Sequence, residues 1–239
     1  MKILGIITAR GGSKRVPRKN IKEFLGKPLL AWSIEIGKEA DVFDRFILTT
    51  EDKEIAEIGK KYGIEVPFMR PKEFALDTSK SFDAIRHAVE WLKESDNFYP
   101  DWIILLEPTS PGRRPFHIRE IVEIIKNNQG KIDSIISISK LPSHYHPLKV
   151  LKMENGGLVK RQTGKLIRET EIRNQDFPEL YYSNSAIYAF RTGNLFGENP
   201  NLWGNKTLGY LMDEKYSMDI DTLEDWLMAE IKMRKLIDN

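Results

Sequence analysis

The sequence contains no cysteine. This absence excludes a disulfide framework, a thiolate zinc site and a cysteine nucleophile. Histidine is scarce as well, and its spacing does not suit zinc, because only the last two histidines are close together and no third ligand follows them. We interpret all of them as structural or surface residues: His87, His117, His144 and His146.

An excess of charge of one sign and long apolar runs are also missing. The chain has 37 basic and 35 acidic residues, a net charge of +2, far from the strongly basic balance of a non-specific nucleic-acid binder. Apolar runs such as residues 103–106 are much shorter than the roughly 20 residues that span a bilayer. The apolar stretch of residues 3–9 is too short for a signal peptide. We therefore expect a cytoplasmic protein that binds neither nucleic acid nor membrane.

Short β-branched runs alternate with helical patterns along most of the chain. The predicted strands are residues 3–8, 45–50, 64–68, 102–107 and 133–139. The predicted helices are residues 28–40, 51–63, 82–94 and 115–128, and either Thr50 or Asp52 could cap the second of them. This alternation predicts an α/β fold whose mainly parallel sheet is covered by helices on both faces and binds ligands beyond the carboxyl ends of its strands.

The alternation stops in the segment 141–179, which is polar and interrupted by proline and glycine. Such composition favours hairpins over another strand and helix. A strand at 180–190 and a terminal helix at 223–236 then follow. We therefore predict one α/β domain, formed by residues 1–140 and 180–239, with an inserted β-rich excursion at 141–179. A long irregular segment is unusual inside a compact domain, so we expect the excursion to pack on a second subunit of a homodimer.

The loop TARGGSKRVPRKN, Thr8 to Asn20, follows the first predicted strand. Gly11 and Gly12 allow a tight turn that aims successive N–H groups at an anion. Cationic side chains that could surround this anion are Arg10, Lys14 and Lys19. The loop lacks the spacing of the two commonest phosphate-binding motifs. It is either a different kind of phosphate cradle or a basic, solvated surface loop.

The segment SMDIDTLEDW, residues 217–226, contains Asp219 and Asp221 on either side of one apolar residue. Mg²⁺ prefers oxygen ligands and keeps several waters, so two carboxylates can hold it together with substrate phosphates. The alternative is structural, because Asp221 or Thr222 could simply cap the terminal helix.

Two further loops follow predicted strands. LLEPTSPGRR, residues 105–114, could present Glu107, Thr109 and Ser110 to a polyhydroxylated ligand, or could be an ordinary connection from strand to helix. In RPKEFALDTSKS, residues 70–81, Arg70 could reach a nucleobase or pair with an acidic neighbour.

Together these motifs make the sequence similar, nearly end to end, to the acylneuraminate cytidylyltransferase family, the CMP-sialic acid synthetases. The resemblance lies in ARGGSKRVPRKNI, RPKEFALDTSKS, LLEPTSPGRR, HPLK, SNSAIYAF and MDIDTLEDW. It implies a nucleotide-diphospho-sugar transferase-like fold and a homodimer that contacts through the excursion. It also implies an enzyme of the nucleotidyltransferase class, in which the anomeric hydroxyl of a nine-carbon acidic sugar attacks the α-phosphate of CTP in the presence of Mg²⁺.

The resemblance also implies roles for individual residues. Arg10, Ser13 and Lys19 would bind the triphosphate, Asn20, Arg70 and Ser81 the base, Asp219 and Asp221 the Mg²⁺, and Glu107, Lys149, Arg173 and Tyr188 the sugar. Lys19, Arg10 and Asp221 would be the catalytic residues, with Lys19 stabilising the charge of the transition state and Asp221 helping to deprotonate the attacking hydroxyl.

Three residues depart from the sialic-acid-specific pattern. Glu107 replaces a glutamine, Gly112 a leucine and Ser185 a glycine. A carboxylate at position 107 accepts hydrogen bonds but cannot donate them. We therefore hypothesise a diacetamido nonulosonic acid of the legionaminic or pseudaminic type, whose additional N–H could donate to Glu107. Alternatives are transfer from GTP, a 3-deoxy-manno-octulosonate cytidylyltransferase, or a nucleotide-binding module without turnover.

Overall fold

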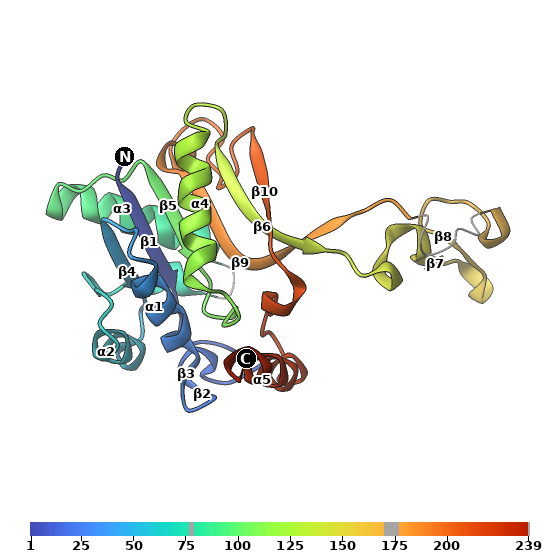
Figure 1. Ribbon diagram of the computed structural model, residues 1–239, viewed down its shortest axis with the longest axis horizontal. Coiled ribbons are helices and arrows are strands. Elements are labelled where there is room, and N and C mark those ends of the chain that lie inside the picture. The colour runs from blue at the N-terminus through green and yellow to red at the C-terminus, as the bar shows by residue number, and fades with distance from the viewer. Residues whose placement is uncertain (77–78, 170–176, 239) are drawn as a thin grey trace.

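A six-stranded sheet forms the centre of the computed structural model, which describes residues 1–76, 79–169 and 177–238. Its strands lie in the order β10-β6-β9-β5-β1-β4 (Figure 1). Their bounds are β1 (Ile3–Thr8), β4 (Arg45–Thr49), β5 (Trp102–Leu106), β6 (Ser134–Lys140), β9 (Tyr181–Arg191) and β10 (Thr207–Leu211). Only β9 among them runs antiparallel to its neighbours. The prediction of a mainly parallel α/β sheet is confirmed.

Helices cover both faces of the sheet. They are α1 (Leu29–Ala40), α2 (Lys53–Lys61), α3 (Ser81–Asp96) and α4 (Pro115–Asn127), whereas the last helix, α5 (Leu223–Ile237), packs elsewhere. Because successive side chains of a strand point to opposite faces, Ile3 and Ile7 of β1 join the core cluster that contains residues of α1 and α4. Leu4 and Ile6 join the cluster beneath α3. This two-sided burial explains why the central strands are almost continuously apolar.

The helix starts settle two alternatives that the sequence leaves open. Asp52 caps α2 by accepting hydrogen bonds from the N–H groups of Glu54 and Ile55, at 2.9 and 3.0 Å. Thr222 caps α5 and forms a reciprocal capping box with Asp225. Asp221 is therefore not the cap of the terminal helix.

One predicted strand is wrong. Residues 64–68 form only an isolated bridge, between Ile47 and Glu65. Pro67 has no N–H to continue a ladder, which explains why pairing stops after one bridge. The structure also adds strand β10 and the small hairpin of β2 (Glu23–Phe24) and β3 (Lys27–Pro28), which the sequence did not predict.

Helix α5 packs on this hairpin rather than on the main sheet. The rings of Phe24 and Trp226 meet edge to face with centroids 5.2 Å apart, and Met218, Ile220 and Met233 belong to the same buried cluster. The contact holds the segment that precedes α5 beside the loop that follows β1.

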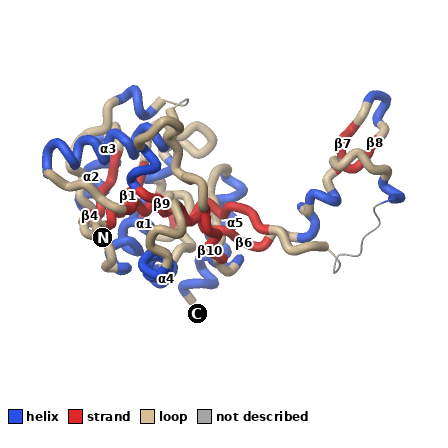
Figure 2. Tube along the Cα trace, turned by 90° about the horizontal axis from the view of Figure 1, so that it is seen from above, coloured by secondary structure: helices blue, strands red, loops and turns tan. Residues whose placement is uncertain are grey.

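Between β6 and β9 the chain forms an arm that projects away from the body of the molecule (Figures 1 and 2). We use "the arm" for the described residues of the segment 141–180. It contains the antiparallel pair β7 (Leu151–Met153) and β8 (Val159–Arg161), so the prediction of a hairpin is confirmed. Large apolar side chains are exposed along it, namely Tyr145, Val150, Leu151, Met153, Leu158, Val159, Leu166, Ile167 and Leu180. Among the helices that the structure describes, none combines the length and apolarity needed to cross a membrane.

Candidate active site

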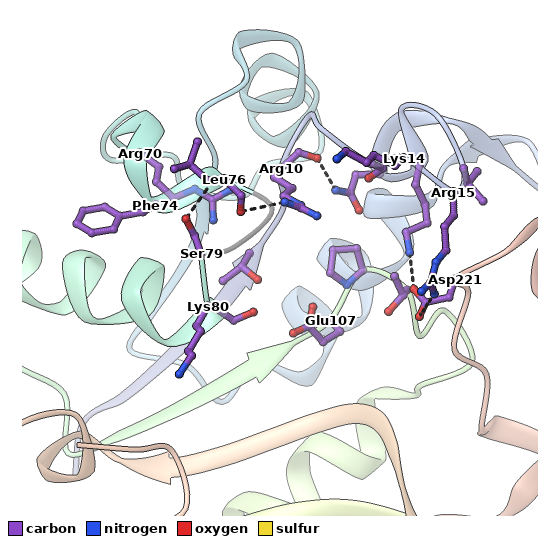
Figure 3. A pocket seen from close by; sticks show the side chains of 18 residues that line it. Arg10, Lys14, Arg15, Arg70, Phe74, Leu76, Ser79, Lys80, Glu107 and Asp221 are labelled. Carbon is purple, nitrogen blue, oxygen red and sulfur yellow. Dashed lines mark hydrogen bonds and ion pairs between the residues drawn. The ribbon is translucent and has the colours of Figure 1, made fainter. Parts of the chain in front are cut away.

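A cavity of about 470 Å³ opens where β1 and β5 end. This edge of a mainly parallel sheet is where ligands generally bind. Most of the residues that the sequence predicts for a site line this cavity: Arg10, Ser13, Lys14, Lys19, Asn20, Arg70, Ser81, Glu107, Thr109 and Asp221. In Figure 3, Arg70, Phe74 and Lys80 lie on one side of the cavity, and Arg15 and Asp221 lie on the other. We call these two sides the Arg70 end and the Asp221 end.

At the Asp221 end, three motifs that are distant in sequence meet. The Nζ of Lys19 donates to the Ile220 carbonyl at 2.6 Å and to the Asp221 carboxylate at 3.0 Å. Arg15 contributes a second cation, 3.6 Å from Asp221. The N–H of Ile220 donates to the carbonyl of Thr109 at 3.0 Å. A lysine, a carboxylate and the loop after β5 are therefore held together at one point of the cavity wall.

At the Arg70 end, the loop after β1 contacts the segment before α3. Arg10 donates to the Leu76 carbonyl at 3.0 Å (Figure 3). Asn20 donates to the Arg10 carbonyl at 3.0 Å, which supports the same loop from beneath. Arg70 faces the cavity and also pairs with Glu51 at 2.8 Å. The two interpretations of Arg70, ligand contact and ion pair, are thus compatible.

Glu107 lies between the two ends and is half-buried (Figure 3). Burial raises the pKa of Glu107 to about 7, against the attraction of the Arg113 guanidinium and with a further increase from the negative charge of Asp219. Arg113 is completely buried, and it donates to the backbone carbonyl of Glu107 at 2.9 Å and to the hydroxyl of Ser33 at 2.5 Å. The buried cation thus fixes the backbone that presents Glu107.

Asp219 adjoins the cavity without lining it. Although the residue as a whole is exposed, desolvation of its carboxylate by the surrounding protein raises the pKa of Asp219, and hydrogen bonds with Ser185 and Thr109 oppose this shift. Within the described residues, no group of three or more histidine, aspartate or glutamate side chains could hold a metal ion. The Asp219 and Asp221 pair therefore fits a hard cation only if phosphate oxygens and water supply the remaining ligands.

The other predicted glycine and serine residues have supporting positions. Gly11 and Gly12 lie within the loop, and the N–H of Gly11 donates to Glu51 at 2.8 Å. Ser110 is buried, and its hydroxyl donates to the Ser185 carbonyl at 3.2 Å. These residues shape the site rather than line the cavity.

Two residues predicted to bind the sugar, Tyr188 and Lys149, are not part of the cavity lining. Tyr188 belongs to β9, where its ring packs against Trp203 with centroids 5.5 Å apart. Lys149 lies on the arm, with its Nζ 5.1 Å from the centroid of the Phe177 ring. Arg173 lies outside the described residues. Lys149 is thus on the part of the molecule that projects away from its own cavity (Figure 1).

The structure shows the surroundings of Ser185 and Gly112, two of the residues that depart from the sialic-acid-specific pattern. Ser185 has a φ of 59°, in the left-handed region that glycine adopts more easily. It lies where the register of the β6 and β9 pair shifts. At Gly112, an added Cβ would lie 2.5 Å from the Tyr216 carbonyl oxygen, so a larger residue requires that backbone to move.

Sequence reasoning missed Glu51, Arg15 and Arg113. Glu51 carried one available signal, because it follows β4 at the edge of the sheet where the other loops converge. Arg15 stands within the basic loop, but only the folded chain shows that it faces Asp221. Nothing in the sequence around Arg113 distinguishes a buried arginine from an exposed one.

Comparison with known proteins adds the family context. The model of the cytidylyltransferase family matches residues 4–218. A CMP-N,N'-diacetyllegionaminic acid synthase of Legionella pneumophila is 34% identical over 231 residues, which cover 96% of this chain and 95% of that protein. A pseudaminic acid cytidylyltransferase of Campylobacter jejuni is 32% identical, with 97% of this chain and 96% of that protein covered.

A solved structure has the same fold at much lower identity. It is a CMP:2-keto-3-deoxy-manno-octonic acid synthetase complexed with CTP, which is 15% identical, with a TM-score of 0.69 and coverage of 98% of this chain and 99% of that chain. At this identity the likeness shows the fold alone.

Proposed function

Because the chain belongs to the cytidylyltransferase family, we propose that it transfers CMP from CTP to a nine-carbon acidic sugar and releases pyrophosphate. The observation that carries this proposal is the meeting of Lys19, Asp221 and the Thr109 loop at one end of a basic cavity. A cation and a carboxylate at one point suit a reaction in which a phosphate gains negative charge while a hydroxyl loses its proton.

The reaction forms one bond and breaks another at the α-phosphorus. The anomeric oxygen of the sugar bonds to the α-phosphorus, the bond from that phosphorus to the β-phosphate oxygen breaks, and pyrophosphate leaves with the electron pair. Lys19 stabilises the additional charge on the phosphate oxygens. Asp221 takes the proton of the hydroxyl, directly or through water. Arg10, Ser13 and Lys14 bind the triphosphate, supported by their positions on the cavity wall.

The base belongs at the Arg70 end in this proposal. Asn20, Arg70 and Ser81 line that part of the cavity or support its loop. A base there leaves the triphosphate directed toward Lys19 and Asp221.

We propose that Asp219 and Asp221 hold Mg²⁺ together with the triphosphate. The ion would neutralise phosphate charge and orient the leaving group. The support is the oxygen chemistry of the pair and its position next to Lys19, which also contacts Asp221. Hydrogen bonds with Ser185 and Thr109 orient Asp219.

For the sugar, Glu107 favours a diacetamido nonulosonic acid over N-acetylneuraminic acid. Its carboxylate faces the cavity and can accept a hydrogen bond from a second acetamido N–H. Thr109 and Ser110 belong to the same loop, and Tyr188 lies on the neighbouring strand. The two relatives described above, whose names specify legionaminic and pseudaminic acids, agree with this choice.

The arm supports a homodimer. Its exposed apolar side chains, among them Met153 at 73% and Leu158 at 70% exposure, need a partner surface to leave water. A second copy of the chain is the partner that we propose. If Lys149 contacts the sugar, it does so from the arm of one subunit in the cavity of the other.

The test is pyrophosphate release with Mg²⁺, with CTP and GTP offered in turn. The acceptors are N-acetylneuraminic, legionaminic and pseudaminic acids and the eight-carbon acid. Release with CTP and a diacetamido acid is expected. A clear preference for N-acetylneuraminic acid would overturn the role of Glu107, and preference for GTP or the eight-carbon acid would establish one of the alternatives. Nucleotide binding without release from any pair would favour a module without turnover.

A further inference from the structure

The turn between β4 and α2 contacts two parts of the proposed nucleotide site at once. Glu51, in this turn, accepts a hydrogen bond from the backbone N–H of Gly11 through Oε1 and one from the Arg70 guanidinium through Oε2, both at 2.8 Å. Gly11 belongs to the loop after β1, and Arg70 lies at the opposite end of the cavity from Asp221 (Figure 3). One carboxylate therefore bridges two segments that are far apart in the sequence.

The residues on either side of Glu51 strengthen this bridge. The N–H of Arg70 donates to the Thr50 carbonyl at 2.9 Å. On the other side, a Cβ at Gly11 would lie only 2.4 Å from Oδ2 of Asp52, so the loop passes against the turn with no room for a side chain. The whole turn thus holds both segments, and Glu51 is its only member whose side chain contacts both.

The burial of the Glu51 and Arg70 side chains shows that the bridge is not a surface ion pair. The side chain of Arg70 is 4% exposed and that of Glu51 is 16% exposed. A second hydrogen bond, from Arg70 to the Ala9 carbonyl at 2.9 Å, fixes the guanidinium further. Buried charge-assisted hydrogen bonds of this kind define geometry more strictly than exposed pairs do.

The charge of Glu51 is unfavourable for the activity that we propose. By simple electrostatics, a carboxylate beside a loop that binds a triphosphate repels the ligand. Removing only this repulsion would strengthen nucleotide binding. A benefit that outweighs the repulsion must therefore come from what the carboxylate holds in position.

We propose that Glu51 is a positioning residue for the nucleotide, which fixes the Gly11 loop and Arg70 at the separation that a nucleoside triphosphate requires. The proposal rests on the proposed nucleotide site. Glu51 does not contact the nucleotide, and it acts through the loop amide and the arginine.

The variant Glu51→Gln tests the proposal, because the two explanations predict opposite signs. The amide offers one oxygen and one NH₂ group to two donors, so one hydrogen bond is lost and two donors face each other. We expect the Kd and the KM for CTP to rise about tenfold, with the KM for the sugar unchanged. An unchanged or lower Kd for CTP would overturn the proposal, because it would mean that Glu51 affects the nucleotide only through the repulsion of its negative charge.

Two further variants serve as controls. Glu57→Gln removes a charge from an exposed pair with Lys60 on α2, and it should leave the Kd for CTP unchanged. In an Arg70→Ala background, Glu51→Gln should cost clearly less than in the wild type, because one of its two partners is already gone. Full additivity of the two substitutions would contradict the bridge.

Measuring CTP binding by calorimetry, in addition to turnover, allows the positioning role of Glu51 to be tested separately from the proposed transfer reaction. Wild-type protein that binds CTP without turnover would overturn the proposed transfer reaction and leave the Glu51 prediction testable through the Kd. Wild-type protein that binds neither CTP nor GTP would overturn both. If Glu51→Gln does not fold, Glu51→Asp replaces it, since it keeps the charge beside Arg70 but shortens the reach. A wild-type Kd in Glu51→Asp would then refute the bridge.

Discussion

Replacing Glu107 by glutamine should stabilise the folded protein in a way that depends on pH. Burial beside Asp219 raises the pKa of Glu107 from 4.5 to about 7, although Arg113 attracts the charged form. The ionised carboxylate is therefore disfavoured in the folded protein compared with the unfolded chain. Glutamine has nearly the same shape but never takes a charge, so the variant escapes this penalty.

The sign and size follow from linkage between protonation and folding. A folded pKa above the unfolded one stabilises the protein fully below pH 4.5, and this contribution is lost as the pH rises to about 7. The difference between the two pKa values then corresponds to a penalty of about 3 kcal/mol at pH 8 and about 1 kcal/mol at pH 5. Because one side of Glu107 faces the cavity, these figures are upper limits.

The assay is urea unfolding of both proteins at several pH values, in EDTA and without nucleotide. The free energy of unfolding of Glu107→Gln should exceed that of the wild type by more at pH 8 than at pH 5, and the gain should approach a plateau above pH 7. Glu57→Gln, an exposed carboxylate on α2, is the control and should show no such trend. A gain for Glu107→Gln that is the same at both pH values would refute a raised pKa as its origin.

Three further predictions concern the proposed reaction and assembly. Lys19→Ala should lower kcat roughly 100-fold with a smaller change in the Kd for CTP, measured by steady-state kinetics and calorimetry; undiminished kcat would contradict its role. Asp221→Asn should raise the Mg²⁺ concentration that gives half-maximal rate, and an unchanged Mg²⁺ titration would remove it from the metal site. The double substitution Met153→Asp with Leu158→Asp should convert a dimer to a monomer in light scattering, and a stable dimer would show that the arm is not the interface.

The central strands could be predicted from the sequence because their burial is encoded locally. The strand of residues 3–8 is apolar at nearly every position, as a strand covered on both faces must be. Residues 64–68 also contain branched apolar side chains, yet only Glu65 pairs with β4, since Pro67 has no N–H to continue the ladder. A strand depends on its partner, and the partner is distant in sequence. The same reason hides β10 (207–211), which pairs with β6.

The residue types of the candidate site could be predicted from the sequence, but the contacts between distant residues of the site could not. Glycines and cations after the first strand indicate an anion site through local properties alone. The contact of Lys19 with Asp221 joins residues 202 positions apart, and the bridge through Glu51 joins three loops. No local pattern distinguishes such a glutamate from one that faces water.

Three cations that face the cavity, Lys19, Arg15 and Arg70, contact carboxylates. In the proposed site, this pairing would determine how nucleotide and metal ion affect each other. Lys19 and Arg15 contact Asp221, which is 57% exposed. At the proposed site, a triphosphate would compete with Asp221 for the same two cations, because charge-assisted bonds to phosphate would replace those to the carboxylate. Asp221 would then be available to a divalent ion that also binds the phosphates, so each ligand would favour the other by an equal factor. The pair of Arg70 with Glu51 differs, because both side chains are held by further hydrogen bonds and shielded from water. The proposed site would thus combine an exchangeable ion pair at the end assigned to the reaction with a fixed ion pair at the end assigned to the base of the nucleotide.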